Sequence, residues 1–315
     1  MSTILPASLK ENDKIAIVSP SGAVDTQYLQ GAVARLKEWN LNPVVSRFAE
    51  GKCGRFSGTP EERAADLQQA IDDPEVKAIL CSRGGYGAVQ IIDQIDFSSF
   101  ELNPKWLIGF SDITVLHSAI SALGAVSLHA VMAKQLALNP ADDESLTNLQ
   151  DILFGKTVNY TLPTHPLNRN GKTKGILTGG NLSIIQSLRG THYDIFPDNK
   201  ILFIEDVCEE PYRIDRIMQN LKVGGILENL SGLIVGQFSD YEEDPSMLKT
   251  VYELIADAVA DYDYPVCFDF PAGHVSRNLP LVLGAIYEFE VTTTNYTNSS
   301  ELNKFAHVEL RLIRS

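Results

Sequence analysis

In the first half of the chain, short apolar runs alternate with segments whose apolar residues recur at helical spacing. Buried strands are predicted for residues 14–18, 76–81 and 106–110, and a short strand for residues 43–46. Helices are predicted for residues 27–39, for a segment that starts at Thr59 and continues to Ile71, and for residues 113–123. Continuous apolar strands joined by helices are typical of a parallel sheet that helices cover on both faces, so an α/β fold is expected.

Residues 155–173 interrupt this pattern with glycine, proline and asparagine, which favour loops. We therefore predict an amino-terminal domain over residues 1–154, a linker over 155–173 and a carboxyl-terminal α/β domain over 174–315, with the site between the two domains. The second domain is expected to hold strands near 175–178, 200–205, 230–236 and 264–268, and helices near 181–188, 212–221 and 245–260. Alternation of apolar and polar residues over 281–293 and 305–313 predicts antiparallel strands.

Charge and composition narrow the classes of function. The 315 residues carry a net charge of −14, which argues against nucleic acid or an anionic membrane surface as a partner. We find no secretory signal at the start and no apolar run near the roughly 20 residues that span a membrane, so a cytoplasmic protein is expected. The four cysteines are scattered and are expected to be free, buried thiols.

Ser111 is the candidate nucleophile. It follows a predicted buried strand and precedes a predicted helix, which is the setting of a nucleophile elbow, although Ile113 stands where the G-x-S-x-G pattern has its last glycine. The alternative is that Ser111 or Asp112 only caps the helix. Both roles can coexist, because the helix start offers free N–H groups such as that of Asp112 for an oxyanion hole.

A serine hydroxyl needs a base and a group that orients the base. His274 lies in a loop after a predicted strand, and Glu205 ends another apolar strand, where a carboxylate points into the site region of an α/β fold. His117 and His129 are rival bases and Asp206 is the rival acid. The alternatives are a packing role for His274 and a solvated strand end for Glu205.

Glycines at 84, 85 and 87 would let backbone N–H groups approach a ligand and complete the oxyanion hole, or they form an ordinary tight turn. Their spacing does not match a dinucleotide fingerprint, and two phosphate-loop look-alikes at 155–157 and 171–173 lack the required earlier glycine. The histidines show no metal-ligand spacing. We therefore predict no cofactor and no metal.

With these residues placed, the chain resembles the LD-carboxypeptidase family of serine peptidases, the muramoyltetrapeptide carboxypeptidases, over nearly its full length. The segments that carry the resemblance are 15–22 (Ile-Ala-Ile-Val-Ser-Pro-Ser-Gly), 54–59 (Gly-Arg-Phe-Ser-Gly-Thr) with Glu62-Arg63, 83–87 (Arg-Gly-Gly-Tyr-Gly), 108–114 (Ile-Gly-Phe-Ser-Asp-Ile-Thr), 179–182 (Gly-Gly-Asn-Leu), Glu205-Asp206 with Tyr212-Arg213 and Asp215-Arg216, and Gly273-His274. Several weak motifs in the same order are more specific than any one of them.

The resemblance implies a catalytic triad of Ser111, Glu205 and His274, and an oxyanion hole from the N–H groups of Gly85 and Asp112. It also implies a flavodoxin-like amino-terminal domain, a carboxyl-terminal domain with a β-barrel-like sheet, and a cytoplasmic homodimer. One departure is Leu128-His-Ala-Val-Met132, where members of the family often read Leu-His-Gly-Pro-Met. This departure bears on the shape of the substrate pocket.

The expected reaction is hydrolysis of the L,D amide bond that releases terminal D-alanine from a murein tetrapeptide in peptidoglycan recycling. Candidate substrate-binding residues are Arg83, Tyr86, Asn181 and Arg213. Arg83 or Arg213 would pair with the terminal carboxylate, with a structural ion pair as the alternative for each. Two other functions stay open: a self-immunity peptidase that cleaves microcin C-type antibiotics, and a non-catalytic ligand-binding α/β module.

Overall fold

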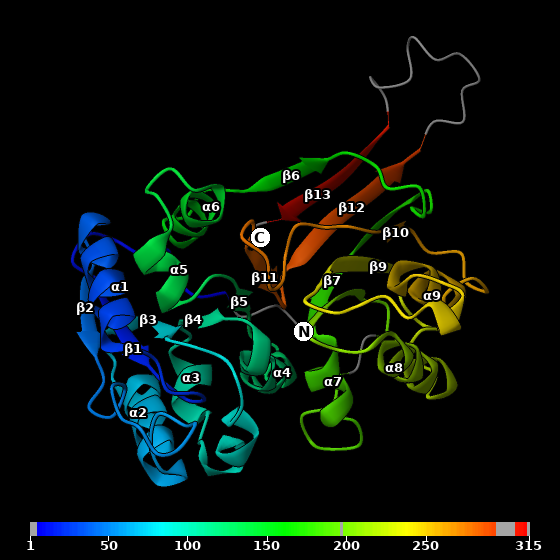
Figure 1. The fold of residues 1–315 in the computed structure, drawn as a ribbon. Helices are drawn as coiled ribbons and strands as arrows, with labels where there is room; N and C mark the ends of the chain where they lie inside the picture. Colours follow the sequence, from blue (N-terminus) through cyan, green and yellow to red (C-terminus); the bar gives the residue numbers. More distant parts are fainter. Residues whose placement is uncertain (1–4, 196–197, 294–305, 314–315) are drawn as a thin grey trace. The chain divides into compact units, whose positions relative to one another are not determined.

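A computed structural model of the protein describes residues 5–195, 198–293 and 306–313. Contacts divide the chain into two compact units, each built on its own sheet (Figure 1). Unit 1 comprises Met1–Lys156 with Arg277–Gly284, and unit 2 comprises Thr157–Ser276 with Ala285–Ser315.

Unit 1 has a six-stranded sheet in the order β11-β5-β4-β3-β1-β2. Its strands are β1 (Lys14–Val18), β2 (Asn42–Val45), β3 (Val76–Cys81), β4 (Trp106–Gly109), β5 (Ser127–His129) and β11 (Leu281–Leu283). Its helices are α1 (Thr26–Glu38), α2 (Pro60–Asp72), α3 (Ser98–Leu102), α4 (Thr114–Ala122), α5 (Ala133–Leu138) and α6 (Glu144–Leu153). In Figure 1, α1 and α5 lie on one side of this sheet, and α2 and α3 lie on the other.

Strands β1 to β5 run parallel, so their carboxyl ends meet at one edge of the sheet. The turns after β1, β3 and β4 therefore lie along the same edge. Strand β11 returns from the far end of the sequence and pairs antiparallel with β5, with Leu281 opposite His129. The parallel α/β expectation for this part of the chain is confirmed.

Unit 2 has a seven-stranded mixed sheet in the order β10-β9-β8-β7-β12-β13-β6. Its strands are β6 (Asn159–Leu162), β7 (Gly171–Asn181), β8 (Ile201–Val207), β9 (Gly232–Ser239), β10 (Val266–Cys267), β12 (Ile286–Thr292) and β13 (His307–Ile313). Its helices are α7 (Leu182–Ser187), α8 (Pro211–Val223) and α9 (Val251–Ala258). Strands β7 to β10 are parallel, whereas β12 pairs antiparallel with β7 and β13.

The core of unit 2 explains why some of its strands are continuously apolar and others alternate between apolar and polar residues. Strand β8 is buried along almost its whole length, and the side chains of α7, α8 and α9 pack on it in one hydrophobic cluster. Strands β12 and β13 instead alternate between buried positions and half-buried or exposed ones, as a sheet with one covered face requires. The predicted antiparallel pair near the end of the chain is confirmed.

Several expectations need comment. The stretch 155–173 contains strand β6 and the start of β7, and the predicted domain limits stay a prediction. The four cysteines are free, as expected, but only Cys81 and Cys267 are buried, whereas Cys53 and Cys208 are exposed because they lie in loops. Over the described part of the chain, no helix is both long enough and apolar enough to cross a bilayer.

Candidate active site

Ser111 lies in a strained turn between β4 and α4. It opens a single 3-10 turn, Ser111–Ile113, and its φ of +67° is in the left-handed region, which costs a non-glycine residue roughly 1–2 kcal/mol. Gly109 lets this turn close, because a Cβ there would lie 3.0 Å from the side chain of Ile113. A strained serine between a buried strand and a helix is the arrangement of a nucleophile elbow.

The turn after β3 packs directly against Ser111. A Cβ on Gly84 would lie 3.0 Å from Ser111 Oγ and 3.3 Å from the backbone nitrogen of Asp112, so only glycine fits there. Gly85 has a φ of +101°. The Gly84 carbonyl accepts a hydrogen bond from the Gly22 N–H at 3.0 Å, which ties the turn to the one after β1. Backbone of the glycine turn is thus held beside the Ser111 hydroxyl.

The side chain of Asp112 holds these turns together from within. Its buried Oδ2 accepts hydrogen bonds from Ser21 Oγ at 2.6 Å and from the Ala88 N–H at 2.8 Å. Because the carboxylate is bound in the interior, the backbone N–H of Asp112 is fixed in place beside Gly84. A rigid N–H donor next to a nucleophile is what an oxyanion hole needs.

Arg63, on α2, also holds the turns of this site together, a role that the sequence analysis did not assign to it. Its guanidinium is buried, and Nη1 donates to the carbonyls of Pro20 at 2.7 Å and Gly87 at 2.9 Å. The available signal was its position: an arginine close to the start of a helix, where acidic residues are favoured, directly after Glu61 and Glu62. Arg63 therefore links the turns after β1 and β3.

The rival base His117 has a structural role. Its ring is buried, with Nδ1 2.8 Å from Ser127 Oγ and Nε2 2.9 Å from the Gly109 carbonyl oxygen. Burial lowers the pKa of His117 to about 4, so the ring is neutral at neutral pH. The other rival, His129, is buried at the end of β5 and packs against the ring of Phe110.

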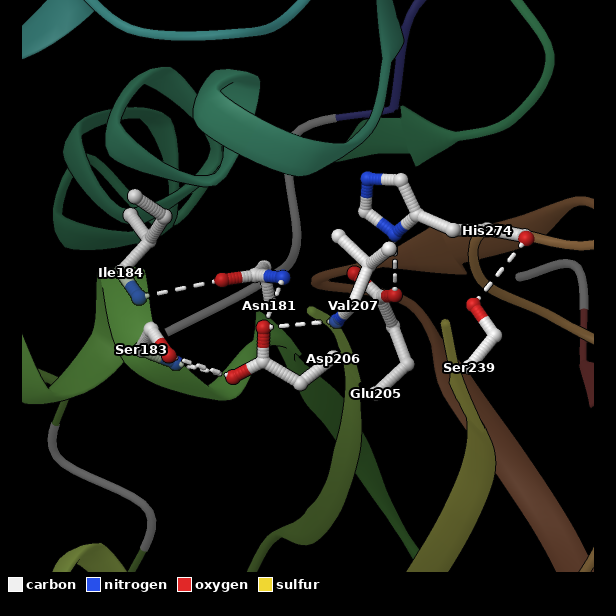
Figure 2. A network of polar contacts seen from close by, with 8 residues as sticks. All are labelled: Asn181, Ser183, Ile184, Glu205, Asp206, Val207, Ser239 and His274. Carbon is white, nitrogen blue, oxygen red and sulfur yellow. Dashed lines mark hydrogen bonds and ion pairs between the residues drawn. The ribbon is translucent and has the colours of Figure 1, made fainter. Parts of the chain in front are cut away.

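In unit 2, the half-buried His274 and the buried Glu205 form a hydrogen-bonded pair (Figure 2). His274 Nδ1 lies 2.8 Å from Glu205 Oε2, and their side chains are 18% and 0% exposed. Because a carboxylate only accepts, Nδ1 carries the proton and Nε2 keeps its lone pair. In Figure 2 the second ring nitrogen lies on the side of the ring away from Glu205, where it can take a proton from another group.

The electrostatic surroundings favour the charged form of His274. Burial by itself lowers the pKa of His274, but the hydrogen bond to Glu205 and the negative charges of Glu205, Asp206 and Asp240 outweigh burial, so the pKa is raised above its ordinary value. The imidazolium that forms when His274 accepts a proton is therefore stabilised in place. This is the effect that a general base needs from its acidic partner.

A bulge in the sheet presents Glu205. Ile204 lies opposite Val235, but Asp206 lies opposite Phe238, so β9 has an extra residue where β8 has Glu205. Bulges bend a strand and redirect a side chain near functional sites.

Two glycines make room for the carboxylate. A Cβ on Gly273 would lie 2.9 Å from Glu205 Oε2, and a Cβ on Gly236 would lie 3.2 Å from the Glu205 Cβ. Gly273 also has a φ of +130°, which L side chains rarely adopt. The Gly-His dipeptide at 273–274 is therefore required by the packing of the pair.

Asp206, the rival acid, directs its carboxylate at the start of α7. It accepts hydrogen bonds from Asn181 Nδ2 at 2.9 Å, from the Ser183 N–H at 2.9 Å and from the Val207 N–H at 2.8 Å (Figure 2). Burial raises the pKa of Asp206 to about 6. Asn181 also caps α7, because its Oδ1 accepts from the Ile184 N–H at 3.2 Å, and its predicted contact with substrate stays a prediction.

The loop that carries His274 is fastened to β9, chiefly by Gln237. The Gln237 N–H donates to the Ala272 carbonyl at 2.9 Å, and its side-chain Nε2 donates to Asp269 Oδ1 at 2.8 Å. Ser239 Oγ donates to the His274 carbonyl at 3.2 Å. Nothing in the sequence marked Gln237, because its role depends on a loop more than 30 residues further along the chain.

The other predicted substrate-binding residues lie at the surface. Arg83 and Tyr86 belong to the glycine turn of unit 1, and Tyr86 is 42% exposed. Arg213 lies on α8 in unit 2, where its Nε donates to the Tyr212 hydroxyl at 3.2 Å and its Nη1 lies 3.6 Å from Glu209 Oε2. An ion pair with Glu209, just before the start of α8, accounts for Arg213 as well as a substrate contact would.

Two family models match the chain. The LD-carboxypeptidase N-terminal domain matches residues 15–130, and the LD-carboxypeptidase C-terminal domain matches residues 174–289. A probable murein peptide carboxypeptidase of Bacillus subtilis is 33% identical over 287 residues, which cover 89% of each chain. The chain belongs to the LD-carboxypeptidase family. The predicted family and its carboxypeptidase activity are thus confirmed.

Solved structures of this LD-carboxypeptidase fold agree. The muramoyltetrapeptide carboxypeptidase of Oxalobacter formigenes matches with a TM-score of 0.84 and 25% identity, covering 95% of this chain and 98% of that one. A microcin C7 self-immunity protein in complex with aspartyl sulfamoyl adenosine matches with a TM-score of 0.83 and 22% identity, over 98% of each chain. The second likeness shows the fold alone. The α/β fold class is confirmed for this LD-carboxypeptidase family member.

Proposed function

We propose that the protein is a serine carboxypeptidase that hydrolyses the L,D amide bond before the terminal D-alanine of murein tetrapeptides. The observation that carries the catalytic part is the hydrogen-bonded Glu205–His274 pair, with Nδ1 held by the buried carboxylate and the His274 pKa raised. The relatives named as murein peptide and murein tetrapeptide carboxypeptidases support the choice of substrate.

In the first half of the reaction, Ser111 Oγ attacks the carbonyl carbon of the scissile amide while His274 Nε2 takes the hydroxyl proton. The N–H groups of Gly85 and Asp112 donate to the oxyanion of the tetrahedral intermediate, and loss of one such donor typically costs about 10²–10³ in rate. This step requires Ser111 of unit 1 and His274 of unit 2 to converge, which is part of the proposal.

In the second half, the C–N bond breaks and His274 gives its proton to the departing amine of D-alanine. Water then attacks the acyl-serine with His274 as base, and the shortened peptide leaves with a new carboxylate. Glu205 stabilises the imidazolium in both halves. This reaction needs the three side chains, backbone donors and water.

The test is release of free D-alanine from a synthetic murein tetrapeptide. The parent protein should release it with the tripeptide as the other product, and Ser111→Ala should release none. The control variant Ser99→Ala, at a half-buried serine of α3 in the same unit, should behave as the parent. Turnover by Ser111→Ala at the parental rate would refute the nucleophile. If the parent protein binds the tetrapeptide without cleaving it, the ligand-binding alternative holds.

The microcin-type alternative shares the catalytic residues and differs in the need for a surface that stacks on a nucleobase. Phe238 and Tyr241, the aromatic residues near that part of unit 2, pack against its hydrophobic core. This packing favours the murein peptide. If the protein cleaves a processed microcin but not the tetrapeptide, as measured by release of the nucleotide product, the microcin-type function replaces the murein function.

We further propose that the protein acts in the cytoplasm as a homodimer, which the family resemblance implies. The net charge of −14 disfavours binding to anionic lipid and to nucleic acid. Light scattering coupled to gel filtration should give twice the chain mass of 34.7 kDa. A mass of one chain at micromolar concentration would refute the dimer.

A further inference from the structure

Beside the nucleophile turn, unit 1 has a hollow of about 450 Å³. Gly22 and Gly85 line it. The Gly22 N–H donates to the carbonyl of Gly84, the residue before Gly85, and Ser111 leaves no room for a side chain on Gly84. The hollow is therefore lined by the proposed oxyanion donor Gly85, whose chain neighbour Gly84 lies against Ser111. Its volume is in the range that takes a ligand much larger than one alanine.

Three cations line this hollow, in a chain where acids outnumber bases. They are Lys52, Arg55 and Arg83, and the acids of the lining are Asp25 and Glu50, so the lining has a net charge of +1 (three minus two). The whole protein carries −14. A local excess of positive charge in an acidic protein favours an anionic group of the ligand.

Arg83 is held by a hydrogen bond to the backbone, and Arg55 lies near an aromatic ring. Arg83 Nη1 donates to the Ala23 carbonyl at 2.7 Å, which uses one of the five N–H donors of the guanidinium. The Arg55 Cζ lies 5.9 Å from the centre of the Tyr86 ring, and that ring lies 5.8 Å from the ring of Phe56. Held guanidinium groups bind carboxylates with less loss of side-chain entropy than free ones.

We propose that this hollow binds the stem of the peptide on the acyl side of the scissile bond, and that Arg55 and Arg83 select a free carboxylate there over an amidated one. The inference rests on the proposed function and specifies its substrate. Departing D-alanine is small and carries a single carboxylate at its own end. A hollow of this size with several cations fits the longer acyl portion, whose glutamyl and diamino acid residues can each carry a further carboxylate.

Three synthetic tetrapeptides distinguish the two residues that could supply this carboxylate. One has both stem carboxylates free, one is amidated only at the glutamyl residue, and one only at the diamino acid. Binding to Ser111→Ala is measured by calorimetry, and kcat/KM is measured on the parent. We expect the free peptide to bind about tenfold more tightly than one of the amidated peptides, since a hydrogen bond to a charged group is worth about 1.5 kcal/mol or more.

Arg55→Gln and Arg83→Gln are each made alone and on the Ser111→Ala background. Each should weaken binding of the free peptide without weakening binding of the amidated peptides, and so remove most of the preference for the free carboxylate. Lys37→Gln is the matched control, because Lys37 is exposed at the other end of α1 and does not line the hollow. Thermal unfolding of each variant reports on folding. A selectivity that survives both arginine substitutions would overturn the inference.

The outcomes separate the two proposals. Equal binding and equal cleavage of all three peptides would refute the selectivity and leave the carboxypeptidase function standing. Selective binding without release of D-alanine would refute the function and leave the anion-selective hollow standing.

Discussion

At the scale of single residues, the site depends on Glu205 as an ionised partner of His274. Glu205→Gln keeps the size of the side chain but removes the charge and lets Nδ1 face either an oxygen or an N–H group. We expect kcat to fall by about 10³–10⁴, as for the loss of the acid in a serine triad. Kinetics with tetrapeptide measure this, and an activity within threefold of the parent would show that Glu205 has no such role.

The pH profile follows from the sign of the His274 shift. The base must be neutral to accept the Ser111 proton, and the His274 pKa is raised above its ordinary value of about 6.5. The acid limb of kcat/KM should therefore have its midpoint above pH 6.5, with activity lost as pH falls through it. In Glu205→Gln the midpoint should move to lower pH. An unmoved midpoint would assign the limb to another group.

Gly273 sets how closely the loop approaches Glu205. Gly273→Ala adds a Cβ within 2.9 Å of Glu205 Oε2 at a φ of +130°, so both strain and a clash are expected. Gly190→Ala is the matched control, because Gly190 also has a positive φ but has open space around its Cβ position.

The control should lose about 1 kcal/mol of unfolding free energy and keep its activity. Gly273→Ala should lose at least as much unfolding free energy and, in addition, at least tenfold in kcat. Denaturant unfolding and tetrapeptide kinetics measure the two quantities. Equal activity in both variants would mean that the position of the loop is not set by this contact.

At the scale of elements, strand β9 determines where His274 lies. Gln237→Leu removes the side-chain hydrogen bonds to the loop, to Asp269 Oδ1 and to the Phe270 carbonyl, while leaving the strand intact. We expect a lower kcat, and an acid limb moved to lower pH because a looser loop weakens the contact with Glu205.

Gln186→Leu, on the exposed side of α7, is the control for a surface glutamine. The pH profile separates positioning from folding, because a variant that is merely less stable keeps the parental midpoint. A parental midpoint and parental kcat in Gln237→Leu would contradict the role of this strand.

Much of the element pattern could be predicted because each element has a local cause. Strand β1 matches its predicted span, since a buried parallel strand is a continuous apolar run. Helix α2 begins at Pro60 behind a Thr59 capping box, and that start could be read from four consecutive residues. Strands β12 and β13 follow from strict alternation.

What could not be predicted depends on contacts between distant segments. The predicted strand over 281–293 divides at Gly284, where φ is +87°, and its first part pairs with β5 of unit 1. Helices α5 and α6 lie in a stretch for which no element was predicted. Within the site, the predicted His274 and Glu205 do meet, whereas the supporting roles of Arg63 and Gln237 arise only from folding.

At the scale of the whole molecule, the proposed reaction requires side chains from both units. Unit 1 provides a strained serine beside fixed backbone donors, and unit 2 provides a half-buried base with its buried acid. Neither half is chemically sufficient, because a serine hydroxyl without a base is almost inert at neutral pH.

The most direct measurement is covalent labelling with a fluorophosphonate, followed by intact mass and peptide mapping. The proposed triad predicts one label on Ser111 in the parent protein, none in Ser111→Ala, and labelling slowed by at least about 10³ in His274→Ala, since the base activates the hydroxyl. Labelling of His274→Ala at the parental rate, or a label on another residue, would contradict it.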